Sequence, residues 1–385
     1  MVNMKIGIDA SNIRTGGGKN HLVNFINHSL EYDKNISFVV ISNNSILSSI
    51  KRNKRITTHT NFLLNSINLF AFISQLLFSY RYFKVNNCDL VFVPGGIFVS
   101  KFRPYITMSQ NMIPFDDHTI KKFGLLSRIK FKLVKYFQIK TFKRSKGVIF
   151  LNNYVKNKIT REVLGKLNYK IIPHGIIHQK KNCYTFSNKP FKILYVSDFL
   201  PYKNNINVVQ AVSELILEGH NIDLTLIGKK DKYQFGLINK LIRSNKILMK
   251  KIKVLGGLSN DIVLKHYKDA SLFLFASTCE NQPIIILEAL SFGLPIISSN
   301  RGPMKSMISG DNVLFDSYKT NDIKCVIQKN MSSIKLNKLS KSNYLLSKNY
   351  NWKKNVSETI AFFKSLIITF EMLNPIYIGF ILKYP

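Results

Sequence analysis

The chain has 385 residues, of which 45% are hydrophobic and 20% charged, which suits two ordinary folded domains and excludes a disordered or fibrous protein. Its 56 Lys and Arg against 21 Asp and Glu give a net charge of +35. Such a charge attracts nucleic acid, anionic lipid or diphosphates, although lysines that merely decorate a surface explain it equally well. The four cysteines are widely spaced without a CxxC pair, which argues against a zinc site or a disulfide framework and favours a reducing compartment.

We expect neither a signal peptide nor a membrane span. The first residues, MVNMKIGIDA, contain no apolar segment of the signal-peptide kind. The apolar stretch at residues 365–384 is interrupted by Glu371, Asn374 and Pro375, so it falls short of the ~18 uninterrupted apolar residues of a spanning helix.

Apolar runs that predict strands alternate with helical patterns through the first half of the chain. The run KIGIDA at residues 5–10 is followed by three glycines and by helical spacing of apolar residues over 21–30. Further strand candidates are ISFVVIS, DLVFVPG, YITMSQ, GVIFLN and YKIIPHG. Continuous apolar runs of this kind are typical of a parallel sheet that is buried on both faces.

The alternation stops at the polar segment IIHQKKNCYTFSNKPFK and then restarts with KILYVSD, DLTLIGK, KIKVLGG, LFLFAST, PIISSN and NVLFD. We therefore predict an α/β fold of two Rossmann-like, doubly wound domains that face one another across a cleft. The predicted boundaries are residues 1–177, a linker at 178–190, residues 191–350, and a C-terminal helix with an apolar tail at 351–385.

The sequence STCENQPIIILEALSFGLPIISSNRGP at residues 277–303 has the strongest chemical pattern. Glu280 lies in a turn after a predicted strand, Pro283 can open a helix at its first position, and Glu288 follows on that helix. Free N–H groups at a helix start bind phosphate, so a nearby carboxylate must instead bind hydroxyls. The pattern favours a sugar nucleotide, although two acids that merely complement the helix dipole explain it about as well. A glycosidase acid and nucleophile pair is disfavoured by the position at a helix start.

Glu280, seven residues and then Glu288 resemble the paired-Glu signature of retaining glycosyltransferases of family 4, in the GT-B superfamily (glycosyl transferases group 1). The flanks agree: a strand before, ENxP in the turn, LEAL in the helix, and GLPIISS after it. The segment ILYVSDFLPYKN at 193–204 resembles the start of the family's second domain, and Lys203 falls where the family has a diphosphate-binding lysine. The resemblance implies catalytic roles for Glu280, which would hold the donor sugar, and for Lys203. Glu288 would hold the ribose.

The resemblance also implies a donor-binding helix start and a glycine loop. The helix start is formed by Pro283, Ile284 and Ile285, and it would help Lys203 to stabilise the leaving diphosphate. The segment RTGGGKNHL resembles the family's first glycine loop, in which Gly17 and Gly18 would let the backbone approach a ligand closely. The segment IPHGI resembles the loop between the domains, with a structural histidine, His174.

Three positions depart from the family pattern. Asp198 stands where the family usually has Arg, Gln110 where many relatives have His, and Ser306 where relatives often have Glu. These departures leave open a non-catalytic GT-B scaffold. A nucleic-acid-binding protein is a weaker alternative, because no recognition motif accompanies the charge. Asp116 and Asp117 lack the spacing of a DxD chelate, so no catalytic metal is expected.

The segment GLLSRIKFKLVKYFQIKTFKRSKG at residues 124–147 predicts a basic helix. Eight Lys or Arg and no acid lie between Arg128 and Lys146, and Leu126, Ile129, Leu133, Phe137 and Ile139 lie roughly on one face. This is typical of a helix on an anionic membrane surface, whereas a core-facing helix with a solvated basic back is the alternative. The apolar residues 61–82 are a second candidate, which could cover an acceptor lipid.

The resemblance therefore implies a retaining hexosyltransferase of bacterial surface polysaccharide (O-antigen or capsule) biosynthesis. It would move a sugar from an NDP-sugar, its donor substrate, to a lipid-linked or oligosaccharide acceptor, with no cofactor and no metal. The expected partners are the NDP-sugar, the glycan acceptor and an anionic membrane surface, and not nucleic acid. The expected location is cytoplasmic, peripheral on the inner face of the plasma membrane. The superfamily also implies that residues 351–385 pack back on the first domain.

Overall fold

The computed structural model describes residues 3–66, 68–179, 190–308 and 313–372. The chain forms two compact units. The first unit contains Met1–Phe115, Arg128–Gly175 and Trp352–Pro385, and the second contains Asp116–Ser127 and Ile176–Asn351. Most of the predicted linker and the apolar tail after residue 372 lie outside the described residues.

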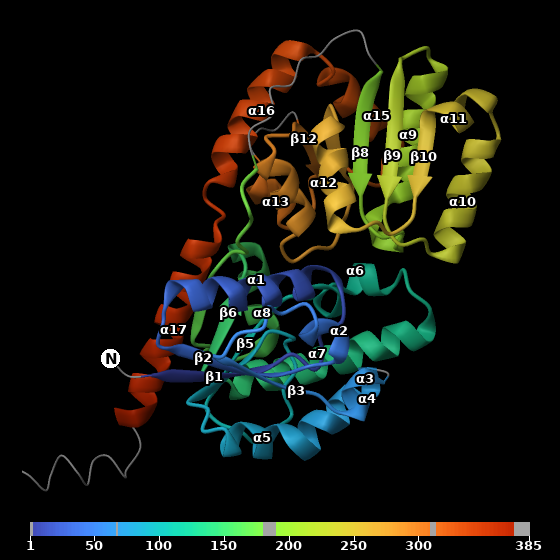
Figure 1. Cartoon of the computed structure of the whole chain (residues 1–385). Coiled ribbons are helices and arrows are strands. Elements are labelled where there is room, and N and C mark those ends of the chain that lie inside the picture. The colour runs from blue at the N-terminus through green and yellow to red at the C-terminus, as the bar shows by residue number, and fades with distance from the viewer. Residues whose placement is uncertain (1–2, 67, 180–189, 309–312, 373–385) are drawn as a thin grey trace, which may run out of the picture. The chain divides into compact units, whose positions relative to one another are not determined.

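The first unit is built on a seven-stranded sheet in which every described strand pair is parallel (Figure 1), in the order β3-β2-β1-β4-β5-β6-β7. The strands are β1 (Met4–Asp9), β2 (Ile36–Ile41), β3 (Ile56–His59), β4 (Leu90–Val93), β5 (Tyr105–Met108), β6 (Gly147–Phe150) and β7 (Tyr169–Ile171). Buried apolar clusters lie on both faces of this sheet, which is why its strands are continuous apolar runs rather than alternating ones.

Helical segments connect these strands. They are α1 (Gly16–Tyr32), α2 (Asn44–Leu47), α3 (Phe62–Asn65), α4 (Asn68–Ser74), the π-helical η1 (Gln75–Ser79), α5 (Tyr80–Val85), η2 (Ile113–Phe115), α7 (Leu125–Arg144) and α8 (Asn153–Val163). The last helix, α17 (Trp352–Met372), packs on α1 within the first unit. A Cβ atom at Gly147 would lie 2.6 Å from Phe362, and one at Gly175 would lie 2.6 Å from Trp352. Glycine at these two positions therefore lets α17 approach the backbone closely.

The second unit has a six-stranded parallel sheet in the order β10-β9-β8-β11-β12-β13. Its strands are β8 (Phe191–Val196), β9 (Ile222–Ile227), β10 (Ile252–Leu255), β11 (Leu272–Phe275), β12 (Ile296–Ser299) and β13 (Leu314–Phe315). Its helices are α6 (Asp117–Ile120), η3 (Pro201–Lys203), α9 (Asn205–Leu217), α10 (Lys232–Arg243), α11 (Lys246–Lys251), α12 (Asn260–Asp269), α13 (Ile284–Ser291), α14 (Met304–Met307), α15 (Thr320–Lys329) and α16 (Ser333–Ser347).

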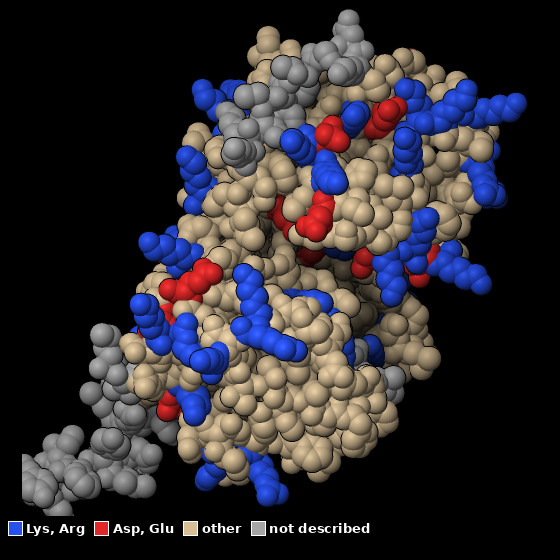
Figure 2. Space-filling model, viewed as in Figure 1, with Lys and Arg blue, Asp and Glu red and all other residues tan. Residues whose placement is uncertain are grey.

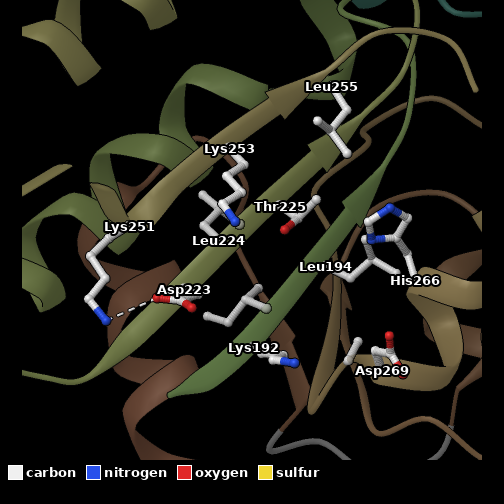
Figure 3. Close-up of a pocket in the computed structure, with 12 residues that line it drawn as sticks. Lys192, Leu194, Asp223, Leu224, Thr225, Lys251, Lys253, Leu255, His266 and Asp269 are labelled. Carbon is white, nitrogen blue, oxygen red and sulfur yellow. Dashed lines mark ion pairs between the residues drawn. The ribbon is translucent and has the colours of Figure 1, made fainter. Parts of the chain in front are cut away.

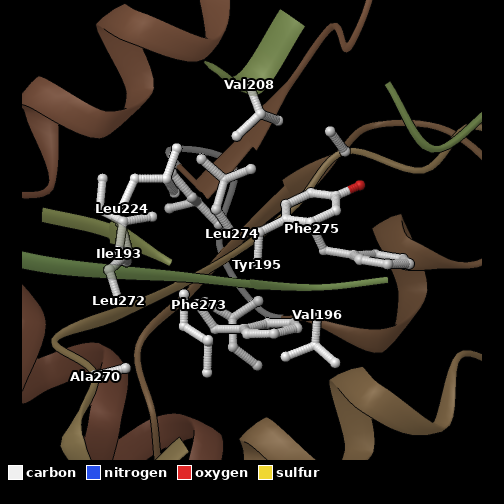
Figure 4. Close-up of a cluster of buried hydrophobic side chains, with 14 of the residues drawn as sticks. Ile193, Tyr195, Val196, Val208, Leu224, Ala270, Leu272, Phe273, Leu274 and Phe275 are labelled. Carbon is white, nitrogen blue, oxygen red and sulfur yellow. The ribbon is translucent and has the colours of Figure 1, made fainter. Parts of the chain in front are cut away.

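The core of the second unit is centred on β8 and β11, the two middle strands of its sheet. Tyr195, Phe273 and Phe275 are fully buried there beside aliphatic side chains (Figure 4). Together, the two parallel sheets with their connecting helices confirm the predicted α/β class.

The surface is basic, and no described helix is long and apolar enough to cross a membrane. Figure 2 shows Lys and Arg spread over both units on the face in view, with fewer acidic side chains among them. The net charge is therefore not confined to one segment.

Candidate active site

Lys203 and Glu280 meet at the carboxyl edge of the second unit's sheet. Lys203 ends η3, shortly after β8, and Glu280 lies in the turn after β11, the neighbouring parallel strand. Lys203 Nζ donates a hydrogen bond to Glu280 Oε1, and the two side chains are only 11% and 14% exposed. The ammonium also lies 5.0 Å from the ring centroid of Tyr202 and 5.4 Å from that of Phe275. The structure thus brings together the two predicted catalytic residues in an ion pair that is largely shielded from water.

The two turns that supply this pair are tied to each other. The backbone N–H and the hydroxyl of Thr278 both donate to the Tyr202 carbonyl, at 2.9 and 3.1 Å. Asn204 donates from Nδ2 to the Ala276 carbonyl at 2.8 Å, while its own backbone is left-handed with φ 52°, a conformation that asparagine tolerates better than most residues. These bonds hold the ion pair in place before any ligand binds.

Glu288 lies on α13 and is enclosed by the core. Burial raises the pKa of its carboxyl from 4.5 to about 7, an effect that a hydrogen bond with Tyr267 partly offsets. The Tyr267 hydroxyl, from α12, lies 3.3 Å from Glu288 Oε2 and 3.1 Å from the Ile285 carbonyl. A buried carboxyl with a pKa near neutrality is a candidate functional group, because its charge is costly until a ligand supplies hydrogen-bond donors. Sequence patterns did not single out Tyr267, which follows the apolar spacing of an ordinary helix.

The start of α13 has backbone N–H groups that could bind an anion. Pro283 is extended at ψ 110° and precedes the helix as its N-cap, one position before the predicted first helical place. Its carbonyl accepts from the N–H groups of Ile286 and Leu287, at 3.1 and 3.5 Å. Ile284 and Ile285 form the first turn, where backbone N–H groups have no partner within the helix. The helix start and its dipole therefore suit a phosphate.

Two of the departures from the family pattern serve local structure. Asp198 accepts the backbone N–H of Lys229 at 2.9 Å, so it joins the loops after β8 and β9. Ser306 donates to the Pro303 carbonyl at 2.8 Å within the first turn of α14. Neither Asp198 nor Ser306 has the charge of the residue that the family usually has at that position. Lys203 is the cation that the structure places beside Glu280 at this edge of the sheet.

The remaining predicted residues belong to the first unit. Gly17 and Gly18 lie in the first turn of α1 rather than in a loop before it. A Cβ atom at Gly18 would lie 3.0 Å from Gln110 Oε1, so glycine leaves room for that side chain. His174 is buried, with Nδ1 3.0 Å from Nδ1 of His21, and burial, followed by the proximity of His21, lowers its pKa well below the usual range. This supports a structural role for His174.

A separate hollow of about 210 Å³ lies on the face of β8, β9 and β10 (Figure 3). Lys192, Asp223 and Lys253 line it, each the second residue of its strand, and Asp223 forms an ion pair with Lys251 at 3.0 Å. It therefore lies toward the amino ends of these strands and contains none of the predicted site residues.

Within the described part of the chain, no group of three or more His, Cys, Asp or Glu side chains could hold a metal ion. Asp116 accepts a hydrogen bond from Thr119 at 2.5 Å, and Asp117 lies in the first turn of α6.

Comparison with known proteins gives a family match for most of the second unit. Residues 177–345 match the model of the family "Glycosyl transferases group 1". This range nearly coincides with Ile176–Asn351 of the second unit and contains Lys203, Glu280 and Glu288. The predicted resemblance to this family is thereby confirmed.

Two curated proteins illustrate the similarity. The capsular polysaccharide biosynthesis glycosyltransferase CapH of Staphylococcus aureus is 24% identical over 59% of this chain and 65% of its own length. A UDP-Gal:alpha-D-GlcNAc-diphosphoundecaprenol alpha-1,3-galactosyltransferase of Escherichia coli is 25% identical over 68% of this chain and 70% of its own length. The chain thus spans somewhat less than two thirds of CapH.

The fold has close counterparts among solved structures. Sucrose-phosphate synthase from Thermosynechococcus elongatus superposes with a TM-score of 0.77, covering 95% of this chain and 100% of that protein at 14% identity. At this identity the similarity concerns the fold alone, and it agrees with the GT-B architecture.

Proposed function

We propose that this chain is a glycosyltransferase that moves a sugar, with retention, from an NDP-sugar to a lipid-linked glycan acceptor in the assembly of a bacterial surface polysaccharide. The observation that carries the proposal is the largely shielded Lys203–Glu280 pair, with Glu280 three residues before the N-cap of α13 and Glu288 further along that helix. The name of the E. coli relative, with its diphosphoundecaprenol, supports the lipid-linked acceptor, and the name of the S. aureus relative supports the capsule setting.

The donor would bind with its diphosphate between Lys203 and the start of α13. Lys203 has three N–H donors, so it can keep its bond to Glu280 and also contact a phosphate oxygen. Glu288 would accept the ribose hydroxyls, and Glu280 would accept a hydroxyl of the donor sugar. Because Asp198 offers no positive charge, Lys203 and the helix dipole would stabilise the diphosphate without a second cation.

The transfer step would be a substitution at the anomeric carbon on one face of the sugar. The bond from this carbon to the diphosphate oxygen breaks, and a bond to the acceptor oxygen forms. The acceptor hydroxyl gives its proton to the departing diphosphate, which the resembled family also uses as the base. Lys203 and the N–H groups of Ile284 and Ile285 would stabilise the charge that develops on the leaving oxygens, so the proposed reaction requires no metal.

The enzyme would act as a peripheral protein on the inner face of the plasma membrane. Ile129, Leu133 and Tyr136 of α7 are 49%, 55% and 58% exposed, whereas a core-facing helix would bury its apolar residues. Exposed cations of α7 surround them. This mixture favours contact with an anionic bilayer over a solvated basic back.

The test is NDP release from a panel of NDP-sugars in the presence of EDTA, with Lys203→Ala and Glu280→Gln as variants. Wild type should release NDP from at least one donor, and both variants should lose most of this activity. Lys338→Ala removes an exposed lysine of α16 and should behave as wild type.

Two outcomes would contradict parts of the proposal. NDP binding without release from any donor would favour the non-catalytic scaffold. Activity that disappears on chelation and returns with Mg²⁺ or Mn²⁺ would refute the metal-free mechanism.

A further inference from the structure

A groove in the first unit separates the α4–η1 segment from α7. At one point the two segments touch through Phe72 and Phe137, whose ring centroids are 4.9 Å apart. Beside this contact lies a cavity of about 180 Å³. Aliphatic and aromatic side chains form most of its wall, together with one threonine and two cations: Phe72, Leu76, Phe98, Val99, Phe137, Thr141, Lys140 and Arg144.

On one side of this groove, η1 buries polar side chains and exposes apolar ones, the reverse of an ordinary surface helix. Gln75 and Ser79 of η1 are buried and donate to Asp9, at 2.9 and 2.8 Å. The residues between them point outward: Leu76, Leu77 and Phe78 are 53%, 62% and 40% exposed. The bonds to Asp9 hold the polar side of η1 against the core, so the apolar side chains of η1 stay exposed. Apolar side chains held at the surface in this way indicate an apolar partner.

The groove is also strongly positive. Lys140 and Arg144 are exposed, and neither takes part in an ion pair among the residues that the structure describes. Burial, and then the like charge of Arg144, lower the pKa of the neighbouring Arg103. The sequence contains no acid between residues 90 and 115 or between 118 and 161. An anion at the groove would therefore relieve repulsion between uncompensated cations.

We propose that this groove binds one anionic phospholipid of the membrane, with a hydrocarbon chain against Phe72, Leu76 and Phe137 and its phosphate on Lys140 and Arg144. This inference rests on the proposed membrane location and extends it from a charged surface to a defined lipid site. A membrane phospholipid fits better than the lipid-linked acceptor, because exposed apolar residues of both helices surround the groove. The groove therefore opens onto the bilayer, where phospholipid is abundant.

The first experiment compares two charge-matched double variants of α7. Lys140→Gln/Arg144→Gln removes the groove cations, and Lys132→Gln/Lys143→Gln removes two exposed cations that do not line the groove. Sedimentation is measured with vesicles of phosphatidylcholine containing phosphatidylglycerol. Both variants lose the same net charge, so a general electrostatic attraction weakens equally. We expect the groove variant to bind about tenfold more weakly than the control, because it also loses charge-assisted contacts to the phosphate. Equal binding would overturn the site.

A second pair of variants tests the apolar part without changing charge. Val99→Trp fills the groove, whereas Leu77→Trp places the same side chain on the exposed surface. The first should weaken vesicle binding and the second should not. If Val99→Trp binds as well as Leu77→Trp, no hydrocarbon chain enters the groove.

The identity of the lipid is tested by competition with soluble probes. Short-chain phosphatidylglycerol should displace the protein from vesicles at lower concentration than farnesyl phosphate does. The reverse order would assign the groove to the isoprenoid acceptor and overturn the proposal. NDP release is measured without vesicles for every variant. If the wild type releases no NDP from any donor, the proposed function is refuted. The vesicle comparison would still decide the lipid site.

Discussion

Replacing Glu288 with Gln should change how stability depends on pH. The carboxyl has a pKa of about 7 in the folded protein, compared with 4.5 as its ordinary value, so ionising it costs on the order of 3 kcal/mol more in the folded than in the unfolded chain. Between these two values the folded state binds more protons than the unfolded state. The contribution of Glu288 to stability is therefore fully favourable below about pH 4.5 and is lost as the pH rises toward about 7.

Glu288→Gln removes this titration while keeping the size of the side chain. The free energy of unfolding of the ligand-free variant, relative to wild type, should increase by about 2–3 kcal/mol between about pH 5 and about pH 8. Denaturant unfolding at a series of pH values measures this difference. If this difference stays constant over the pH range, burial does not raise the pKa of Glu288 to about 7, and the reasoning fails.

The same carboxyl should make nucleotide binding depend on pH in the opposite direction. The ionised form accepts hydrogen bonds from ribose hydroxyls more strongly than the neutral form does, so NDP affinity of the wild type should rise as the pH increases through about 7. Glu288→Gln or Glu288→Ala should weaken NDP binding at high pH by about 1.5–3 kcal/mol, measured by calorimetry. Unchanged NDP affinity in a folded variant would separate Glu288 from the ribose.

Three other predictions follow from the same structure. Tyr267→Phe removes a hydrogen bond that lowers the pKa of Glu288, so the midpoint of pH-dependent NDP binding should move upward; a midpoint that moves down or stays would contradict this. Lys203→Met leaves Glu280 largely buried without its cation and should reduce the free energy of unfolding by about 3 kcal/mol, and Lys203→Met/Glu280→Gln should regain most of it in denaturant titrations. High salt should release the protein from vesicles, since ~1 M salt shortens the Debye length to about 3 Å. The triple variant Lys130→Gln/Lys132→Gln/Lys140→Gln should also weaken vesicle binding. Lys135 is left unchanged because it pairs with Glu162 at 3.0 Å. Binding that persists in high salt would exclude an electrostatic interaction.

Most of the strands that the sequence predicts are buried on both sheet faces, although the edge strand β7 was also predicted, from YKIIPHG, and two of its three residues are exposed. The runs ISFVVIS and LFLFAST contain β2 and β11, because a central parallel strand must be apolar on both sides. The segment ITTH of β3 was not predicted. It is a four-residue edge strand whose threonines are exposed, so its sequence contains no apolar run.

The candidate site could be predicted only where residues adjoin in sequence or match a known motif. The spacing of Glu280 and Glu288 was visible from the chain, whereas the ion pair with Lys203 joins residues 77 positions apart. That contact depends on β8 and β11 being neighbours in the sheet, and single-sequence periodicity does not give strand order. Tyr267 was missed for the same reason, since its hydroxyl reaches Glu288 from a different helix.

The placement of α17 has a consequence for synthesis of the chain on the ribosome. Phe363 of this last helix packs against Phe25 and Phe92, with ring centroids 6.3 and 5.2 Å apart, although both partners are made some 270 or more residues earlier. The first part of the chain to emerge therefore cannot complete its own core, and an apolar surface stays open while the second unit is translated. A polypeptide released before residue 352 should retain a foldable second unit but present this uncovered surface to chaperones and proteases. The native state thus requires α17 to pack on α1 and β4, which are made much earlier.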